Sequence, residues 1–257
     1  MQIRPSKSVP SLVFALSCLT ALPSLAWDCD HKAERSLSED LAGIEKVVLK
    51  ARAGDLSVRV DGTSFRAAGE ACASKASVLE GIQLRSERRG EVLTVEVVVP
   101  ETKGWNQQAR LDLDVSLPAD MPLDIDDSSG DVTVSGARLG RVEDGSGDLR
   151  FQGTHGNLQL EDGSGDVRID GHHGDVKLKD GSGSIRVTDL DGSVLVDQDG
   201  SGDLTMERIA GSVKVEDDGS GDIEVAEVGG DFIVRSAGSG SVRHDGVAGK
   251  VDIPARD

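Results

Sequence analysis

The sequence predicts an all-β protein: a parallel β-solenoid (β-helix) with two short strands in each coil of 17–19 residues. Polar and apolar residues alternate within each repeat, which is typical of half-buried strands. The central glycines of seven repeats, from Gly130 to Gly240, are 17, 18, 18, 19, 19 and 19 residues apart. A fixed period of about 20 residues indicates coils that bury their apolar side only by stacking on one another. The repeated phrases are DSSGDVTV from Asp127, DGSGDLRF from Asp144, DGSGDVRI from Asp162, DGSGSIRV from Asp180, DGSGDLTM from Asp199, DGSGDIEV from Asp218 and AGSGSVRH from Ala237.

The coil from Asp148 to Gly165 shows how each repeat is built. Alternation over 148–152 and 157–161 predicts two five-residue strands, and the glycine-rich segments 153–156 and 162–165 predict two turns. Alternation then places two side chains of each strand in the core, as it does Leu149 and Phe151 in the first strand. The first strands place Val132, Val134, Leu149, Phe151, Val167, Ile169, Ile185, Val187, Leu204, Met206, Ile223, Val225, Val242 and His244 inward. The second strands do the same with Leu158, Leu160, Val176, Leu178, Val194, Val196, Val213, Val215, Phe232, Val234, Val251 and Ile253, and the second turn adds Thr154, His172, Leu190, Ile209, Val228 and Val247.

The chain divides into four expected regions. These are a signal peptide over 1–26, an N-terminal tail over 27–42, an irregular N-terminal β section or cap over 43–126, and regular solenoid repeats over 127–257. A cap is expected because a bare end of the stack exposes unpaired strand edges. Strands are expected at 44–50, 56–60, 82–86, 92–99 and 111–117, Cys72 is expected on an inserted loop, and 37–42 is the one segment with a helical pattern.

The N-terminus has the features of an export signal. Arg4 and Lys7 precede an apolar run over 12–22, and Ser24-Leu25-Ala26 is a small-residue cleavage site, so we expect the mature chain to begin near Trp27. The alternative is a lipoprotein acylated at Cys18, although the three residues before it fit a lipobox poorly. No later stretch is apolar enough for a membrane helix. The expected location is therefore the periplasm or the exterior of the cell.

The net charge limits the classes of partner, and the cysteine content predicts a disulfide. Without residues 1–26 the chain has 26 basic and 46 acidic residues, a net charge of −20. Nucleic acid and anionic lipid are then disfavoured, because both need a basic surface. Cys29 and Cys72 are the two cysteines left in an oxidising compartment, which predicts a disulfide that stabilises the fold by about 3–4 kcal/mol. The oligomeric state does not follow from these features.

Two columns of aspartates are the first candidate site. Stacking aligns Asp144, Asp162, Asp180, Asp199 and Asp218 in one column, and Asp148, Asp166, Asp203 and Asp222 in another that Ser184 and Ser241 interrupt. Neighbouring carboxylates at coil spacing repel one another by about 1 kcal/mol in a water-like dielectric. Solvent and backbone N–H groups of the turns can offset this repulsion, and so can a bound Ca²⁺ with oxygen ligands. The phrase departs from the calcium-binding nonapeptide GGxGxDxUx at the ligand positions.

Histidines form the second candidate site. His155 and His173 occupy the same turn position in successive coils, followed by Asp191 in the next. Two imidazoles and a carboxylate are ligands for Zn²⁺ or Cu²⁺. The alternative is that they are ordinary exposed turn residues.

Catalysis has little support in the residues. Ser146, Ser164 and Ser182 repeat at one position with Ser201, Ser220 and Ser239, which indicates a turn residue rather than a nucleophile, and no His shares their column. The chain has no Tyr, and only Trp27 and Trp105 could stack on a sugar ring. We expect a non-enzymatic protein without a cofactor. A carbohydrate-active β-helix enzyme is the remaining enzymatic alternative.

The order of these segments resembles a known family. Val115-Ser116-Leu117-Pro118-Ala119-Asp120-Met121-Pro122-Leu123-Asp124-Ile125 leads into serial Ser-Gly-Asp coils. This arrangement resembles the bacterial exported β-strand-repeat proteins of unknown function, relatives of the adhesin-like head-GIN-type domains, over residues 43–253. The resemblance implies a β-helix of the cell envelope with an adhesin-like or scaffolding role and an envelope or extracellular partner. It transfers no catalytic residue.

Overall fold

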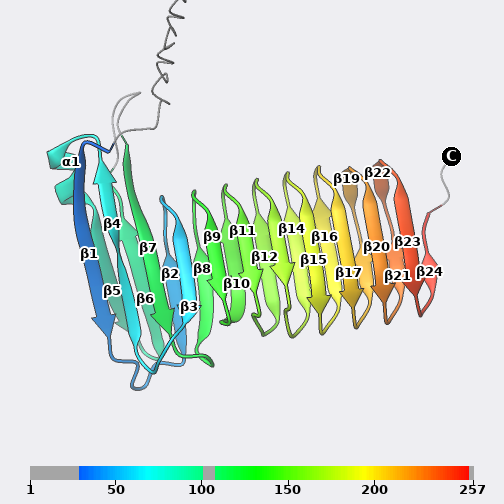
Figure 1. Ribbon diagram of the computed structural model, residues 1–257, viewed down its shortest axis with the longest axis horizontal. Helices are drawn as coiled ribbons and strands as arrows, with labels where there is room; N and C mark the ends of the chain where they lie inside the picture. Colours follow the sequence, from blue (N-terminus) through cyan, green and yellow to red (C-terminus); the bar gives the residue numbers. More distant parts are fainter. Residues whose placement is uncertain (1–28, 101–107, 255–257) are drawn as a thin grey trace, which may run out of the picture.

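The computed structural model describes residues 29–100 and 108–254, so the expected signal peptide, Cys18, Trp27 and Trp105 lie outside the described residues. The predicted β-solenoid is confirmed: two long sheets face each other along a rod (Figure 1). The first sheet, sheet A, has the strand order β1 (His31–Glu39), β4 (Phe65–Ala73), β7 (Ala109–Leu117), β3 (Leu56–Val60), β9 (Val132–Ser135), β11 (Leu149–Gln152), β13 (Val167–Asp170), β15 (Ile185–Leu190), β17 (Leu204–Ile209), β20 (Ile223–Val228) and β23 (Val242–Val247).

The second sheet, sheet B, runs along the opposite side of the rod. Its strand order is β24 (Val251–Asp252), β21 (Phe232–Val234), β18 (Val213–Val215), β16 (Val194–Asp199), β14 (Val176–Asp180), β12 (Leu158–Asp162), β10 (Arg138–Asp144), β8 (Pro122–Asp126), β2 (Lys46–Lys50), β6 (Val92–Val98) and β5 (Gln83–Arg89). In addition, β19 (Asp218–Ser220) pairs with β16, and β22 (Ala237–Ser239) pairs with β19.

The core is a thin aliphatic layer between the two sheets. Every residue expected to face inward between Val132 and Val234 is buried. Equivalent residues of successive coils pair directly, as Leu149 does with Val167 and Val167 with Ile185. Each coil therefore buries its apolar residues against the same kind of residue in the coils on either side.

The glycines of the repeated phrase are required by this close stacking. Gly165 has a φ of +136°, and a Cβ built there would lie 1.9 Å from the carbonyl oxygen of Gly147 in the preceding coil. No other residue fits such an approach. The same contact recurs at each later turn, so the phrase is retained in coil after coil.

The change from 18-residue to 19-residue coils is absorbed by a β-bulge. Leu178 pairs with Val196 but Lys179 pairs with Gln198, which leaves Asp197 as the extra residue. The pairing of Asp180 with Asp199 is restored immediately afterwards. The bulge thus keeps Asp199 on the same side of the strand as its equivalents.

The N-terminal end differs most from expectation. The segment expected to be a tail contains β1, so residues 37–39 are a strand rather than the start of a helix, and the helix of this region is α1 (Ala76–Gly81). β4 and β8 were not foreseen. The coil made by β2 and β3 lies between β6–β7 and β8–β9, so chain order and spatial order differ. No helix of the described residues is long and apolar enough to cross a membrane.

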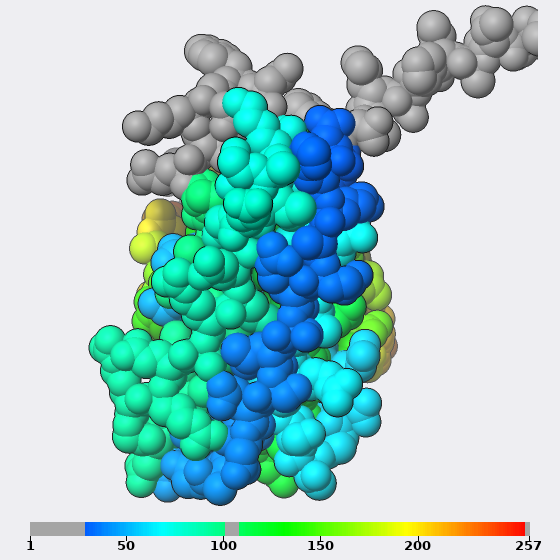
Figure 2. All heavy atoms as spheres, turned by 90° about the vertical axis from the view of Figure 1, so that its left-hand side faces the viewer, coloured from blue at the N-terminus to red at the C-terminus, as the bar shows by residue number. Residues whose placement is uncertain are grey.

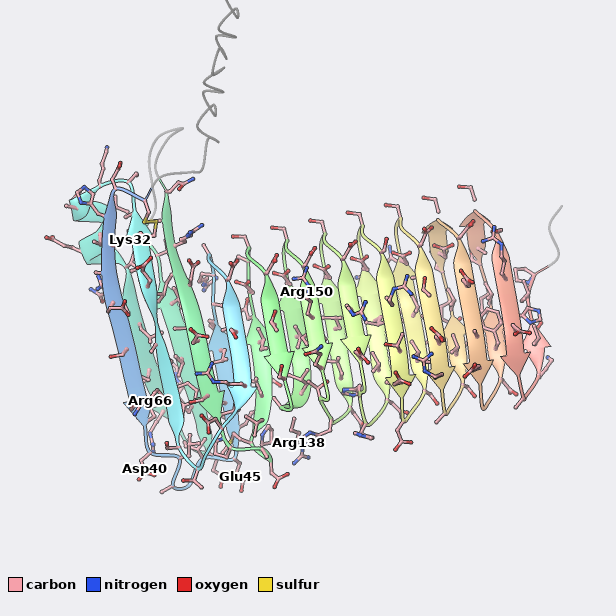
Figure 3. All side chains as sticks on the ribbon, viewed as in Figure 1. Lys32, Asp40, Glu45, Arg66, Arg138 and Arg150 are labelled. Carbon is pink, nitrogen blue, oxygen red and sulfur yellow. A yellow bond between two sulfur atoms is a disulfide. The ribbon has the colours of Figure 1, made fainter. Side chains whose placement is uncertain are left out.

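Antiparallel strands close this end of the rod. β1 pairs with β4, β4 with β7 and β5 with β6, all antiparallel. Figure 2 looks onto this end, where the blue and cyan segments cover the coils behind them. Cys72 lies within β4, not on a loop as expected, and its predicted disulfide with Cys29 is confirmed, with a Cα–Cα distance of 5.7 Å. The disulfide therefore ties the start of β1 to the neighbouring strand (Figure 3).

The register makes a sharp prediction about two adjacent residues. Val196 is fully buried, whereas Leu195 faces outward and is half-buried. We expect Val196→Asp to destabilise the rod by about 3 kcal/mol or more, because the substitution would bury a carboxylate among apolar side chains. Leu195→Asp, the matched control, should change the free energy of unfolding by less than about 1 kcal/mol. Urea unfolding followed by circular dichroism measures both, and equal losses would contradict the register.

Candidate functional site: the aspartate columns

The column of Asp148, Asp166, Asp203 and Asp222 lies on the outer surface, where its carboxylates bond the next coil. Asp148 Oδ1 accepts the backbone N–H of Asp166 at 3.1 Å, and Asp166 Oδ1 accepts that of Ser184 at 2.9 Å. Asp203 and Asp222 make the same bond to Asp222 and Ser241. The N–H donated by Ser241 lowers the pKa of Asp222. These aspartates therefore act as structural clamps between coils.

A second column of clamps was not foreseen. It lies before each second strand, where Asp175 Oδ1 accepts the N–H of Ser193 at 2.9 Å and Ser193 Oγ accepts that of Ser212 at 3.1 Å. Ser212 bonds Asp231 in the same way, and Asp231 bonds Lys250. The signal in the sequence is a recurring short polar residue immediately before each second strand.

The other aspartate column lies inside the rod. It was expected at the turns, but Asp144, Asp162, Asp180 and Asp199 are the last residues of second strands, and Asp218 is aligned with them. All are buried; Asp199 and Asp218 are each 1% exposed. Asp127 extends the column by one coil, and it was not among the expected members. Ala237 ends the column beyond Asp218.

Most oxygens of these inner carboxyl groups have no hydrogen-bond partner. The unpartnered atoms are Oδ2 of Asp127 and Asp162 and both carboxyl oxygens of Asp144, Asp180, Asp199 and Asp218. Asp127 Oδ1 and Asp162 Oδ1 accept N–H bonds from Ser128 and Ser164. A buried ionised carboxylate without a partner is strongly unfavourable, so this arrangement favours the neutral acid.

Burial raises the pKa of every member of the inner column. It raises the pKa of Asp162 and Asp199 to about 7 and of Asp127 and Asp180 to about 6, and it raises the pKa of Asp144 and Asp218 as well. Desolvation is the main cause, and the charges of Asp180 and Asp144 add to it at Asp162. A protonated carboxyl can donate to the carboxyl of the next coil, which two ionised groups cannot do. The column is therefore suited to holding protons.

Cation binding by the aspartates stays a prediction. Oxygen atoms are the ligands that Ca²⁺ takes, and it requires about six to eight of them. Within residues 29–100 and 108–254, no group of three or more His, Cys, Asp or Glu side chains is arranged to hold a metal ion. Of the candidate ligands, Asp144, Asp162, Asp199 and Asp218 lie inside the rod and Asp166, Asp203 and Asp222 on its surface, so they do not form one site.

The histidine column is where the sequence placed it. His155 pairs with His173, and His173 with Asp191, through isolated bridges at the second turn. His173 Nδ1 lies 3.4 Å from Asp191 Oδ2, with both side chains exposed. The neighbouring His172 points into the core, where it contacts Thr154 Oγ1 at 2.9 Å and the carbonyl of Gly156 at 2.8 Å. Burial lowers the pKa of His172, which favours the neutral form of this core residue.

The stacked coils and their clamps define an acidic β-solenoid protein. The chain belongs to the family described as Toastrack DUF4097, whose model matches residues 81–250. No curated protein matches the chain.

Three solved structures are similar to the chain. A candidate adhesin from Bacteroides fragilis is 15% identical, with 88% of this chain and 98% of that chain covered and a TM-score of 0.49. A candidate cell-adhesion protein from Clostridium sporogenes is 12% identical, with 87% and 99% covered and a TM-score of 0.32. A candidate lipid-binding protein from Parabacteroides distasonis is 13% identical, with 88% and 98% covered and a TM-score of 0.41. At these identities and TM-scores, the three proteins say nothing about the function of this chain.

The inner column predicts an unusual dependence of stability on pH. Its pKa values are raised on folding, so the folded protein binds more protons than the unfolded chain between about pH 4 and 7. The contribution to stability is full below about pH 4 and is lost as the pH rises through 6–7. Asp199→Asn removes one titrating group, so at pH 8 we expect a gain on the order of 2–4 kcal/mol and a midpoint raised by roughly 5–10 °C. At pH 4.5 the variant should equal the parent or fall slightly below it.

The matched control is Asp203→Asn. Asp203 lies on the surface, and an amide oxygen can still accept the N–H of Asp222. Its thermal midpoint should follow the parent at both pH values. Unfolding is measured by circular dichroism in excess EDTA, so that protons are the only ligand varied. A lower midpoint for Asp199→Asn than for the parent at pH 8 would contradict a neutral inner column.

Proposed function

We propose that this protein is a non-enzymatic, exported scaffold of the cell envelope: a stiff acidic rod that presents repeated surfaces to an envelope or extracellular partner. The observation that carries the proposal is that the repeated polar residues form hydrogen bonds between neighbouring coils. Asp148, Asp166, Ser193 and Asp231 bond the next coil, which makes them part of the stacking. What recurs along the rod is therefore structure rather than a reaction centre.

The outer faces support a presenting role because they repeat without converging on one cleft. Arg150, Arg168 and Arg186 are aligned side by side on sheet A. Figure 3 shows side chains projecting in rows along the rod, with Arg150 on the outer face and Arg138 at the turns. On sheet B, Lys177, Leu195 and Lys214 line a shallow hollow of about 390 Å³. Such rows offer many similar contacts to an extended partner.

Deletion of single coils tests this function. Removing residues 163–180 joins Asp162 to Gly181 in register, because Asp162 and Asp180 are paired equivalents. Removing 200–218 is the matched second deletion, since Asp199 and Asp218 are equivalents too. Each variant should fold and should keep binding to isolated cell envelopes within roughly twofold of the parent, because each repeat contributes similarly. Co-sedimentation of labelled residues 27–257 with envelope fragments measures the binding.

Two outcomes would overturn the proposal. One is a folded deletion variant that loses binding completely, which would indicate a single local site. The other is a parent protein that does not bind the envelopes at all. Export is tested separately by N-terminal sequencing of the protein recovered from the periplasm, where Trp27 is expected as the first residue.

A calcium-dependent module is the second candidate function; in it Ca²⁺ would displace protons from the inner column, whose carboxyl oxygens have no hydrogen-bond partner. Its test is the thermal midpoint in excess EDTA and then in millimolar CaCl₂ at one pH. A large rise with Ca²⁺, abolished in Asp180→Asn, would support the module. An unchanged midpoint would leave the passive scaffold.

A further inference from the structure

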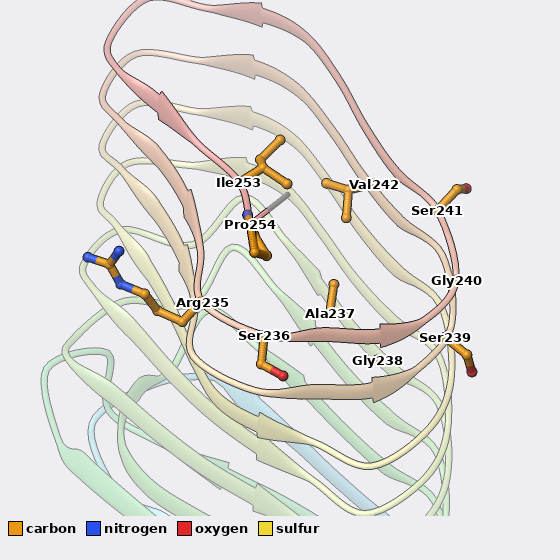
Figure 4. A pocket seen from close by; sticks show the side chains of 10 residues that line it. All are labelled: Arg235, Ser236, Ala237, Gly238, Ser239, Gly240, Ser241, Val242, Ile253 and Pro254. Atoms are coloured by element: carbon orange, nitrogen blue, oxygen red, sulfur yellow. The ribbon is translucent and has the colours of Figure 1, made fainter. Parts of the chain in front are cut away.

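No element of residues 29–100 and 108–254 covers the C-terminal end of the rod, which we call the open end. In the last coil Val242, Val247, Val251 and Ile253 are only half-buried and His244 is exposed, whereas their equivalents one coil earlier are all buried. Of these residues, Val242 and Ile253 line a hollow of about 790 Å³, together with Ala237 and Pro254. Figure 4 looks into it, with Val242, Ala237 and Ile253 pointing into the mouth of the core and Arg235, Ser239 and Ser241 pointing away. A solenoid end of this kind normally needs a polar cap.

Among the described residues, both strands at this end have an edge without a partner strand. β23 is the last strand of sheet A and β24 the last of sheet B. In the preceding coils, the first inward-facing residue of each strand donates its N–H to the next coil. Ile223 donates to the carbonyl of Ser241, and Phe232 donates to that of Lys250. By the alternation of a strand, Val242, His244, Val251 and Ile253 then direct their N–H and C=O groups out of the open end. These groups can pair with another strand.

We propose that the open end binds the open end of a second copy of this chain, with β23 of each copy pairing antiparallel to β24 of the other. The chain reverses direction between Val247 and Val251, so β23 and β24 run in opposite directions. A two-fold axis parallel to the strands places β23 of one copy beside β24 of its partner, and the pairing is antiparallel. This proposal is independent of the envelope-binding function.

The two-fold axis also fixes the register. His244 faces β21 across the core, with its ring 6.1 Å from that of Phe232, and Phe232 pairs with Val251. A rotation about an axis parallel to the strands keeps each residue at its own height, so His244 of one copy lies beside Val251 of the other. Both residues have free N–H and C=O groups, which makes them a hydrogen-bonded pair. Val242 and Ile253 form the next such pair and close the apolar mouth.

The outward residues are complementary in charge in this register. Arg243 lies opposite Asp252 of the second copy, and Asp245 lies opposite Lys250. Each contact occurs twice, because the interface is symmetric. Pro254, which has no N–H to donate, falls opposite Ser241, whose carbonyl already accepts from Ile223. The proline is thus at a position where the new pairing needs no donor.

Charge reversal tests the pairing. Asp245 and Lys250 are both exposed, so substitutions there leave the core intact. Asp245→Lys places two lysines opposite one another at both contacts, and Lys250→Asp places two aspartates there. Each variant alone should raise the dimer dissociation constant by about tenfold or more, because opposed like charges are strongly unfavourable. An equimolar mixture of the two should form a heterodimer, in which every Lys faces an Asp.

Sedimentation velocity of residues 27–257 in 0.15 M salt, over roughly 1–100 µM protein, measures the assembly. The expected results are a parent dimer that dissociates on dilution, two monomeric variants and a dimeric mixture. A parent that is monomeric throughout would overturn the proposal, and so would a Lys250→Asp variant that dimerises like the parent. Circular dichroism of each variant confirms that it is folded. Leu195→Asp, far from the open end, should leave the dimer unchanged.

Discussion

The in-register stacking of coils is the constraint on which the rest of the structure depends. Successive strands of a sheet lie about 4.8 Å apart, so each residue lies directly beside its equivalents in the coils before and after. At Gly165 this leaves no room for a Cβ, and at Asp166 it brings a carboxylate within reach of the next backbone N–H. The close approach at the glycine recurs in each of these coils, and the carboxylate recurs except where Ser184 and Ser241 replace it. The sequence repeats because every coil has the same local geometry and therefore needs the same residue types at the same positions.

Stacking also aligns like charges, and burial decides whether each aligned carboxyl group is ionised. Asp162 and Asp166 are four residues apart in one repeat, yet their columns behave in opposite ways. On the surface, backbone N–H donors and solvent stabilise the ionised form, and the pKa of Asp222 is lowered. Inside, no donor reaches most carboxyl oxygens, and the pKa of Asp162 rises to about 7. The same residue type is thus ionised and bonded to the next coil in one column, whereas burial favours its protonated form in the other.

The regular coils could be predicted from sequence because period-two alternation and glycine spacing both report directly on stacking. The inner aspartates were misplaced because the following glycine is also a turn signal. Continuing the alternation of Leu158 and Leu160 by one step shows that Asp162 faces inward. The bulge at Asp197 could not be foreseen, because an added residue can enter a turn as readily as a strand. β4 is rich in small residues without alternation, and chain order does not show that β2 and β3 lie between later strands.

The two ends of the rod explain why end-to-end association would stop at two copies. Growth into a fibre requires a head-to-tail contact, in which the open end of one copy adds to the opposite end of the next. At the N-terminal end the outermost strands of the described residues, β1 and β5, are joined antiparallel to their neighbours and carry charged side chains such as Lys32 and Arg85. Charges on an edge strand oppose pairing with another chain. An open end that binds only the open end of a second copy forms a closed, symmetric dimer. The two acidic rods then extend from the interface in opposite directions.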